Sequence, residues 1–251
     1  MKKINLTDEQ IKQAKDVLSK FNDYDAFSAS KNNAYSFTKI ICVKVCPYCN
    51  INYIYTVFSE DGDAVLRPDI DHYFCKSKYK KYQLCLYNLI PSCMPCNERL
   101  KGSENFMKTP YLHPYFHDFH SIMRFSVSLN KTTDYLDEDN IEIFFVSKSN
   151  SAPLVVRAKN NIKIFKLEER YQYHKDQVVD LFKNSKYYWK AKRDEISRLF
   201  SKNSDTSTTL HSYLPLESIL FSEKDCDINQ VSLGKLKKDI INYYCLRKNT
   251  K

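Results

Sequence analysis

Apolar positions in the first part of the chain recur every three or four residues. From Ile11 to Phe21 they define one face of an amphipathic helix. Thr7, followed three residues later by Gln10, has the pattern of a capping box, in which each side chain accepts a hydrogen bond from the other residue's backbone N–H. The sequence therefore predicts a helix over residues 7–21.

The pattern becomes strand-like between Phe37 and Ile70. Three runs rich in β-branched and aromatic residues follow one another, KIICVKV, INYIYTVF and AVLRPDI, and Asp61-Gly62 is a turn signal between the last two. Two further runs of this kind, MRFSVSL and IEIFFVS, are separated by an acidic segment, residues 134–140, that predicts a solvated hairpin loop. We expect these five runs to form β-structure.

Beyond Asn160 the spacing of apolar residues is helical again. The run IKIFKLEERYQYHKDQVVDLF carries most of its apolar residues on one helical face, namely Ile164, Leu167, Tyr171, Val178 and Leu181. Further helical stretches are expected at residues 186–200, 216–221 and 232–246, with a polar linker at 201–209. This order predicts an α+β protein with four parts: an N-terminal helical segment (1–36), a core (37–110), a β-rich extension (111–160) and a helical C-terminal region (161–251).

Composition narrows the class of protein. The 251 residues are 43% hydrophobic and 27% charged, which is typical of a globular chain rather than a disordered one. The net charge of +9 favours an anionic partner such as nucleic acid. The sequence has no apolar run of about 18 residues and no signal-peptide pattern, so we expect a cytoplasmic protein without a membrane span. In that compartment the nine cysteines are not expected to form a disulfide framework.

Four of the cysteines stand in two C-x-x-C pairs. The pairs are Cys46-Pro-Tyr-Cys49 and Cys93-Met-Pro-Cys96. Two such pairs can place four thiolates tetrahedrally around Zn²⁺ at about 2.3 Å, and a site of this kind has no open coordination position. We therefore expect a structural zinc ion that closes the long loop between the pairs.

Polar residues that suit phosphodiester chemistry lie between and beside these pairs. A His next to a carboxylate, as in Asp71-His72, can act as a general base near neutral pH. Oxygen ligands from Asp71 and Asn97 would suit a hard cation such as Mg²⁺ or Mn²⁺, and Asn88 could hydrogen-bond the imidazole and fix its orientation. Taken singly, each of these residues is more often a satisfied local pair or a turn cap.

The segments CPYC, DIDHYFCKS, YNLIPSC and CNERLKG, which span Cys46 to Gly102, together resemble the HNH endonucleases. The resemblance implies a ββα-metal core, in which a β-hairpin and a helix enclose a metal ion, stapled by zinc. It implies His72 as the general base, Asp71 and Asn97 as ligands of a catalytic divalent metal, and Asn88 as the residue that orients His72. Cys75 stands where many members of the family have Pro.

The whole layout, with a helical half after the core, is similar to HNH nucleases of bacterial anti-phage defence. That similarity implies DNA as substrate, with RNA not excluded, and an ATPase or another sensor protein as partner. Basic side chains near the core are candidates for phosphate contacts, or else form a solvated surface: Lys76, Lys78, Lys80, Lys81, Arg99 and Lys101.

Two alternatives stay open from the sequence. The first is a non-catalytic zinc-stabilised module that binds nucleic acid or protein and uses the same polar residues as caps. The second concerns the segment HPYFHDFH, whose His113, His117 and His120 have a spacing that could hold another metal, although Pro114 favours a loop there.

Overall fold

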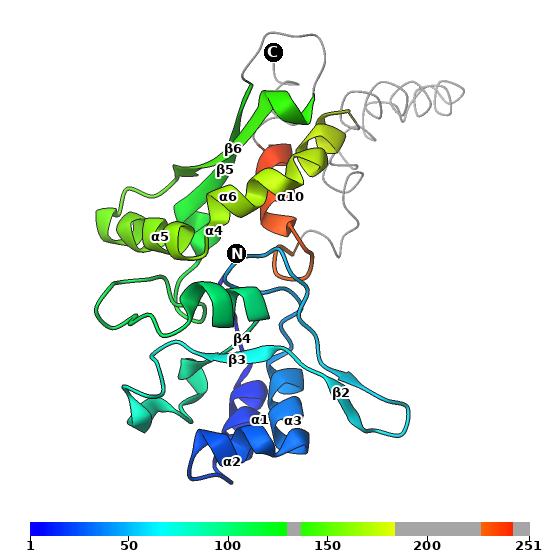
Figure 1. Ribbon diagram of the computed structural model, residues 1–251, viewed down its shortest axis with the longest axis vertical. Coiled ribbons are helices and arrows are strands. Elements are labelled where there is room, and N and C mark those ends of the chain that lie inside the picture. The colour runs from blue at the N-terminus through cyan, green and yellow to red at the C-terminus, as the bar shows by residue number, and fades with distance from the viewer. Residues whose placement is uncertain (130–136, 184–226, 243–251) are drawn as a thin grey trace, which may run out of the picture. The chain divides into compact units, whose positions relative to one another are not determined.

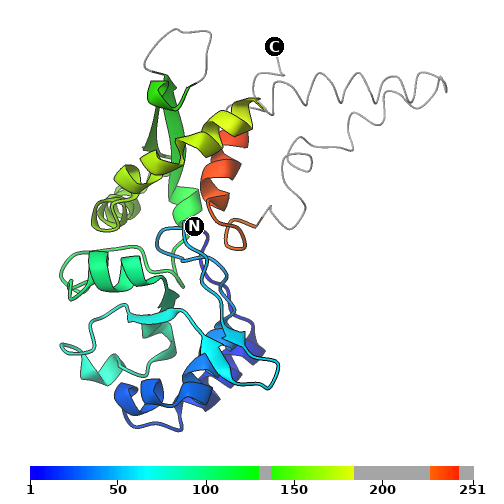
Figure 2. The same cartoon turned by 45° about the vertical axis from the view of Figure 1, so that its right-hand side comes forward.

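The computed structural model describes residues 1–129, 137–183 and 227–242 (Figures 1 and 2). The fold is mixed α and β, as predicted, and its sheets are small and two-stranded. The chain divides into two compact units. The first unit contains Met1–Arg124, Ser147–Leu167 and Ile228–Leu233, and the second contains the described parts of Phe125–Val146, Glu168–Asp227 and Gly234–Lys251. Within the described ranges, no helix has the length and apolarity needed to cross a membrane.

The first unit begins with three short helices, α1 (Asp8–Leu18), α2 (Tyr24–Ala29) and α3 (Lys31–Ile41). The predicted capping box is present at the start of α1, where the backbone N–H of Gln10 donates to Oγ1 of Thr7 at 3.2 Å and the reverse bond measures 3.0 Å. Apolar residues on the inner faces of the three helices are fully buried. The Phe27 and Phe37 rings, for example, meet edge to face at 5.7 Å.

The structure corrects the first part of the predicted strand at KIICVKV, whereas Val45 near its end forms a single antiparallel bridge with Tyr53 of the next run. Residues up to Ile41 belong to α3, and the helix ends at Cys42, which has a left-handed φ of 54°. The buried residues of α3 follow a helical repeat: Ala34, Phe37, Thr38 and Ile41. β-Branched residues disfavour a helix by only a few tenths of a kcal/mol each, so the burial of this apolar face decides the conformation.

Two antiparallel hairpins follow. The first, β1 (Val57–Phe58) with β2 (Ala64–Leu66), is short and exposed, so INYIYTVF and AVLRPDI are strands over only part of their predicted length. The second, β3 (Asp69–His72) with β4 (Leu89–Ser92), is buried, and it pairs Asp69 with Ser92 and His72 with Leu89. Short 3₁₀ turns, η1 (Lys80–Tyr82) and η2 (Leu86–Asn88), lie in the connection between β3 and β4.

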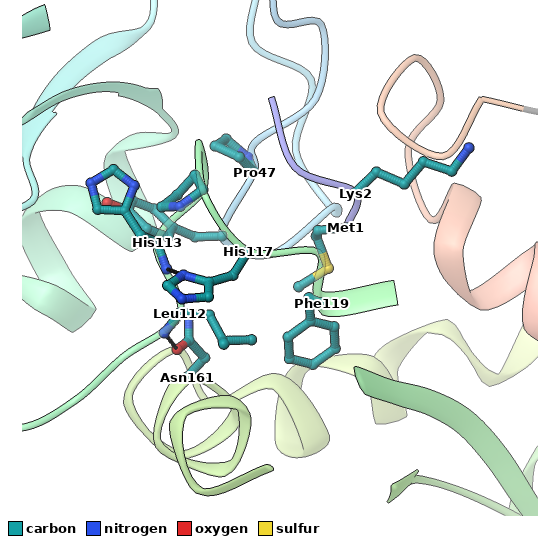
Figure 3. A pocket seen from close by; sticks show the side chains of 10 residues that line it. Met1, Lys2, Pro47, Leu112, His113, His117, Phe119 and Asn161 are labelled. Carbon is teal, nitrogen blue, oxygen red and sulfur yellow. Dashed lines mark hydrogen bonds between the residues drawn. The ribbon is translucent and has the colours of Figure 1, made fainter. Parts of the chain in front are cut away.

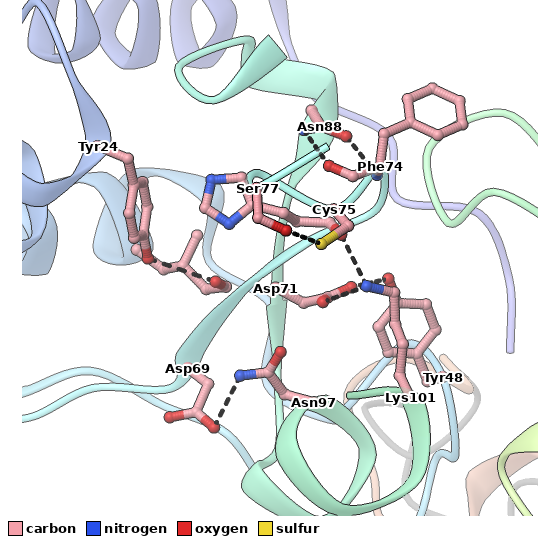
Figure 4. A network of polar contacts seen from close by, with 12 residues as sticks. Tyr24, Tyr48, Asp69, Asp71, Phe74, Cys75, Ser77, Asn88, Asn97 and Lys101 are labelled. Atoms are coloured by element: carbon pink, nitrogen blue, oxygen red, sulfur yellow. Dashed lines mark hydrogen bonds and ion pairs between the residues drawn. The ribbon is translucent and has the colours of Figure 1, made fainter. Parts of the chain in front are cut away.

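A wide helical segment, η3 (Pro95–Lys101), leaves β4 directly after the second C-x-x-C pair. The backbone N–H of Gly102 closes it with a bond to the carbonyl of Asn97 at 2.9 Å, which is the five-residue step of a π-helix. Gly102 has a φ of 47°, a left-handed value that Gly adopts at low cost, and the segment ends there. The hairpin and η3 pack together, so side chains of β3 face side chains of η3 (Figure 4).

The remaining parts of the first unit are α4 (Phe119–Ile122), α5 (Ala152–Ile164) and a C-terminal segment, residues 228–233. That segment contacts the loop after the first cysteine pair. The Asn50 side chain donates to the carbonyl of Ile228 at 2.7 Å, and the N–H of Leu233 donates to the carbonyl of Asn50 at 2.7 Å. The unit therefore joins residues that lie 178 positions apart in the sequence.

The second unit is built on the two-stranded sheet of β5 (Met123–Leu129) and β6 (Ile141–Ser147), and both predicted strands are confirmed. The 3₁₀ turn η4 (Glu138–Asn140) lies directly before β6. The rest of the described part of this unit is helical. It consists of α6 (Leu167–Tyr171), the 3₁₀ turn η5 (Gln172–His174), a helical stretch at 175–183 and α10 (Gly234–Ile240). Phe125 and Tyr171 form its core at 4.3 Å between ring centroids. The helices predicted at 186–200 and 216–221, and the linker at 201–209, lie outside the described residues.

Candidate metal centre and polar cluster

The four cysteines of the two C-x-x-C pairs converge in the first unit. All four are buried, and their Sγ atoms lie within 4.8 Å of one another: Cys46, Cys49, Cys93 and Cys96. The first pair lies in a turn in which the N–H of Asn50 donates to the carbonyl of Cys46 at 2.8 Å, and the second pair lies where β4 passes into η3. In the described part of the chain this is the only group of three or more His, Cys, Asp or Glu side chains close enough to share a metal ion.

The donor set fits zinc. Tetrahedral Zn–S bonds of about 2.3 Å require sulfur–sulfur distances near 3.8 Å, and Sγ of Cys49 lies 3.9 Å from Sγ of Cys93. Backbone N–H groups also point at the sulfurs, from Ile51 to Cys49 at 3.4 Å and from Cys93 to Cys46 at 3.5 Å. Burial raises the pKa of the Cys46 thiol well above its ordinary value, so thiolates at this position need a cation to balance them. The arrangement is that of a closed structural metal site.

Asp71 lies in a buried polar network beside this cluster (Figure 4). Its Oδ1 accepts from Nζ of Lys101 at 2.7 Å, and its Oδ2 accepts from the hydroxyl of Tyr48 at 2.6 Å. Lys101 Nζ also donates to the carbonyl of His72 at 2.7 Å, and the Lys101 side chain is only 2% exposed. Each carboxylate oxygen of Asp71 thus has a protein donor, and an ammonium group stands beside Oδ1. In this arrangement both oxygens of Asp71 are engaged by protein donors, and its role as a metal ligand stays a prediction.

Asn97 contacts Asp69 instead of Asp71. Its Nδ2 lies 3.3 Å from Oδ2 of Asp69, and both side chains are partly exposed (Figure 4). Because side chains alternate along a strand, Asp69 and Asp71 share the face of β3 that meets η3. The structure therefore brings together a carboxylate and an amide, although the carboxylate is two residues before the predicted one.

His72 points to the other face of the hairpin by the same alternation. Its ring packs edge to face against Tyr24 of α2 with 4.2 Å between centroids, and the residue is 8% exposed. Nε2 lies 3.0 Å from the carbonyl of Gln83. Since a carbonyl only accepts, Nε2 carries the proton of the neutral ring and Nδ1 is the basic nitrogen. Burial lowers the pKa of His72, so the ring is neutral near pH 7.

Asn88 bonds the loop after β3 rather than the imidazole. Its Oδ1 accepts from the N–H of Phe74 at 2.7 Å, and its Nδ2 donates to the carbonyls of Phe74 at 3.1 Å and Tyr82 at 3.0 Å. The prediction that Asn88 hydrogen-bonds His72 is therefore replaced by an indirect role: Asn88 holds the segment that leads from His72 towards Gln83, whose carbonyl bonds the ring.

The candidate phosphate contacts separate into two groups. Five are exposed, as a phosphate contact requires: Lys76, Lys78, Lys80, Lys81 and Arg99. Lys76 forms a surface ion pair with Asp25 at 2.6 Å. Lys101 is the exception, since its buried ammonium is bound to Asp71 and cannot reach a phosphate on the surface.

Sequence reasoning missed three members of the cluster: Tyr48, Asp69 and Gln83. The two-residue repeat of DIDH could have placed Asp69 on the same face as Asp71. No local pattern marks the pairing of Lys101 with Asp71, or of Gln83 with His72. Comparison with protein-family models, with curated proteins and with solved structures finds no match for this chain.

Proposed function

We propose that this chain is a metal-dependent endonuclease of the HNH type that hydrolyses phosphodiester bonds in DNA, in bacterial defence against phage. The observation that carries the proposal is the position of Asn97. The cysteine cluster holds the start of η3, and the first turn of η3 then sets Asn97 against Asp69 of β3. A hairpin, a helix and facing oxygen donors next to a structural metal site are the parts that a ββα-metal core requires.

Asp69 and Asn97 are the side chains that suit a catalytic Mg²⁺ or Mn²⁺. A carboxylate and an amide oxygen are ligands for hard cations, and the oxygen and nitrogen of an Asn side chain exchange places by a simple flip. When bound, such a cation would supply positive charge to the phosphate at the cut. Asp71, whose oxygens are held by Lys101 and Tyr48, serves in this proposal to join β3 to η3.

His72 is the last residue of β3, with its ring on the face opposite Asp69, and it has the protonation state that a general base needs for a phosphate lying at that end of the strand. A neutral ring with its proton fixed on Nε2 can accept a proton at Nδ1 from an attacking water. The water oxygen would form a new bond to phosphorus, the bond from phosphorus to the leaving sugar oxygen would break, and that oxygen would take a proton from solvent. The exposed lysines of residues 76–81 would contact flanking phosphates.

Cleavage of a supercoiled plasmid with added Mg²⁺ or Mn²⁺ tests the proposal. We expect His72→Ala to lower the nicking rate by about 100-fold or more, the usual contribution of a general base. Asp69→Asn should also lower it, and more metal should partly restore it. His174→Ala, which removes an imidazole in the second unit, is the matched control and should nick like the wild type. Equal nicking by wild type and His72→Ala would remove the basis of the enzyme proposal.

A non-catalytic zinc module that binds nucleic acid or protein is the second candidate. It is favoured by three observations: each carboxylate oxygen of Asp71 has a protein donor, His72 is 8% exposed, and the His72 ring lies on the other face of β3 from Asp69. This candidate predicts DNA binding that is salt-dependent, indifferent to Mg²⁺ and unaccompanied by cleavage under any metal or with any partner protein.

A further inference from the structure

A hollow in the first unit has the size and lining of a ligand site. It is a cleft of about 560 Å³ between the loop after β3, the segment 106–117 and α5, within the range of about 300–1,000 Å³ that ligand pockets occupy. Its walls are aromatic: Tyr73, Phe74, Tyr82, Tyr87, Phe106 and Phe116. Tyr73 and Phe106 are buried and form the floor of the cleft, whereas Phe116, at 59% exposed, and the neighbouring Met107, at 48%, are open to a ligand.

The cleft also contains a cationic group without a carboxylate. Arg157 of α5 lines it, and its Nη1 donates to the carbonyl of Tyr111 at 3.3 Å. Across residues 1–129, 137–183 and 227–242 no acidic side chain pairs with this guanidinium. A guanidinium has five N–H donors, so most of its capacity is available to an anion.

His117 adds a neutral donor next to Arg157. Its Nδ1 accepts from the backbone N–H of His113 at 2.8 Å, a bond drawn in Figure 3, which shows a neighbouring small pocket that His117 also lines. Burial, together with the nearby charge of Arg157, lowers the pKa of His117, so the ring is neutral near pH 7. Because Nδ1 is the acceptor, the proton must lie on Nε2. The cleft therefore combines an N–H donor and a guanidinium with aromatic walls.

We propose that this cleft binds one nucleotide of a nucleic-acid strand, with the base stacked between the aromatic side chains and the phosphate held by Arg157 and Nε2 of His117. Stacking on aromatic rings and charge-assisted bonds to phosphate are the two interactions that hold single-stranded nucleic acid, and the net charge of +9 favours a polyanion. The inference rests on the proposed function for its substrate class, but it uses neither His72, Asp69 nor Asn97.

Isothermal titration calorimetry of the full zinc-loaded chain tests the site. The probes are a nucleoside 5′-monophosphate, the same nucleoside without phosphate, inorganic phosphate, and a single-stranded oligonucleotide of about eight residues. We expect the monophosphate to bind about tenfold more tightly than the nucleoside. Arg157→Gln should remove that advantage and leave nucleoside binding unchanged, whereas Phe116→Ala should weaken both ligands about equally.

Lys159→Gln is the matched control, because Lys159 is an exposed cation on the same helix. It should bind all four probes like the wild type. His72→Ala should also bind normally, which separates a failure of this site from a failure of the cleavage chemistry. Circular dichroism confirms that each variant is folded.

The following results would overturn the inference. The first is an equal loss of monophosphate affinity in Arg157→Gln and Lys159→Gln, and the second is equal affinity of the wild type for nucleoside and monophosphate. The third is inorganic phosphate that binds as tightly as the monophosphate. The fourth, from a competition titration, is an acidic aromatic peptide that displaces the monophosphate at lower concentration than the nucleotide probes require. An oligonucleotide that binds at least as tightly as the monophosphate, with the same dependence on Arg157, supports a strand as the ligand. Monophosphate binding without oligonucleotide binding contradicts it.

Discussion

Replacing Lys101 with Met tests whether the buried ion pair joins η3 to β3. Met fills a similar volume but removes the ammonium group from Asp71, leaving that carboxylate 3% exposed with one remaining donor, the hydroxyl of Tyr48. Removing one partner of a buried pair costs about 3–5 kcal/mol, because the other charge stays buried. The change also removes the bond from Nζ to the carbonyl of His72. We therefore expect Lys101→Met to lower the free energy of unfolding by about 3–5 kcal/mol.

Urea denaturation at saturating zinc measures this loss. The variants are Lys101→Met, Asp71→Asn and both together, and the double variant should lose less than the sum of the two, since it buries no charge. The control is Lys76→Met, which breaks a Lys–Asp pair of nearly the same length, 2.6 Å against 2.7 Å, on the surface. It should leave the free energy of unfolding nearly unchanged.

An equal and small effect of Lys101→Met and Lys76→Met would refute the reasoning. It would mean that Asp71 has a second partner when Lys101 is absent, for which a divalent cation is the obvious candidate. In that case added Mg²⁺ should raise the urea midpoint of Lys101→Met and not that of the double variant.

Three further predictions concern the same unit. Metal analysis of the freshly purified chain should find zinc near one equivalent, and Cys93→Ser should lose both the zinc and the cooperative unfolding transition; a zinc-free chain that unfolds cooperatively would contradict the structural site. Asn88→Ala removes three hydrogen bonds and should lower the free energy of unfolding by about 2–4 kcal/mol, measured in urea, whereas a loss below about 1 kcal/mol would show that the loop after β3 does not depend on it. Burial lowers the pKa of His113 to about 4 from its ordinary 6.5. Between these two pH values the imidazole is protonated in the unfolded chain and neutral in the folded chain, so a fall in pH favours unfolding. Wild-type stability should therefore fall between about pH 6.5 and pH 4, and His113→Phe should fall less over the same window in urea midpoints taken at each pH; parallel curves would assign the pH dependence to other groups.

Local patterns were sufficient to predict the features that depend on sequence neighbours. The capping box at Thr7 and Gln10, the strands β5 and β6 and the convergence of two C-x-x-C pairs are all present in the structure. Each has a strong local cause, since a cap needs a residue three positions on and a C-x-x-C turn carries its own geometry.

The misplaced features depend on contacts between distant residues. The segment before Ile41 has strand-like residues, but its buried face fixes it as a helix. From the sequence, a lysine beside a predicted active site is expected to contact phosphate. Only the packing of η3 on β3 shows that Lys101 is paired with Asp71 instead. For the same reason, the choice of Asp69 rather than Asp71 as the neighbour of Asn97 follows from the strand register, which pairs Asp69 with Ser92 just before the second cysteine pair.

The contact of residues 228–233 with the first cysteine turn bears on how the protein is made. A ribosome releases the cysteines of residues 46–96 long before Ile228, whose carbonyl bonds Asn50 across 178 residues of chain. The nascent chain can bind its metal and form the hairpin early, but the outer side of the first turn stays uncovered until synthesis is nearly finished. A shorter version that stops at residue 110 would keep every predicted catalytic residue and still lack this cover. We expect such a fragment to aggregate during expression, and a stop just after residue 233, where the first unit ends, to be the earliest that keeps this cover.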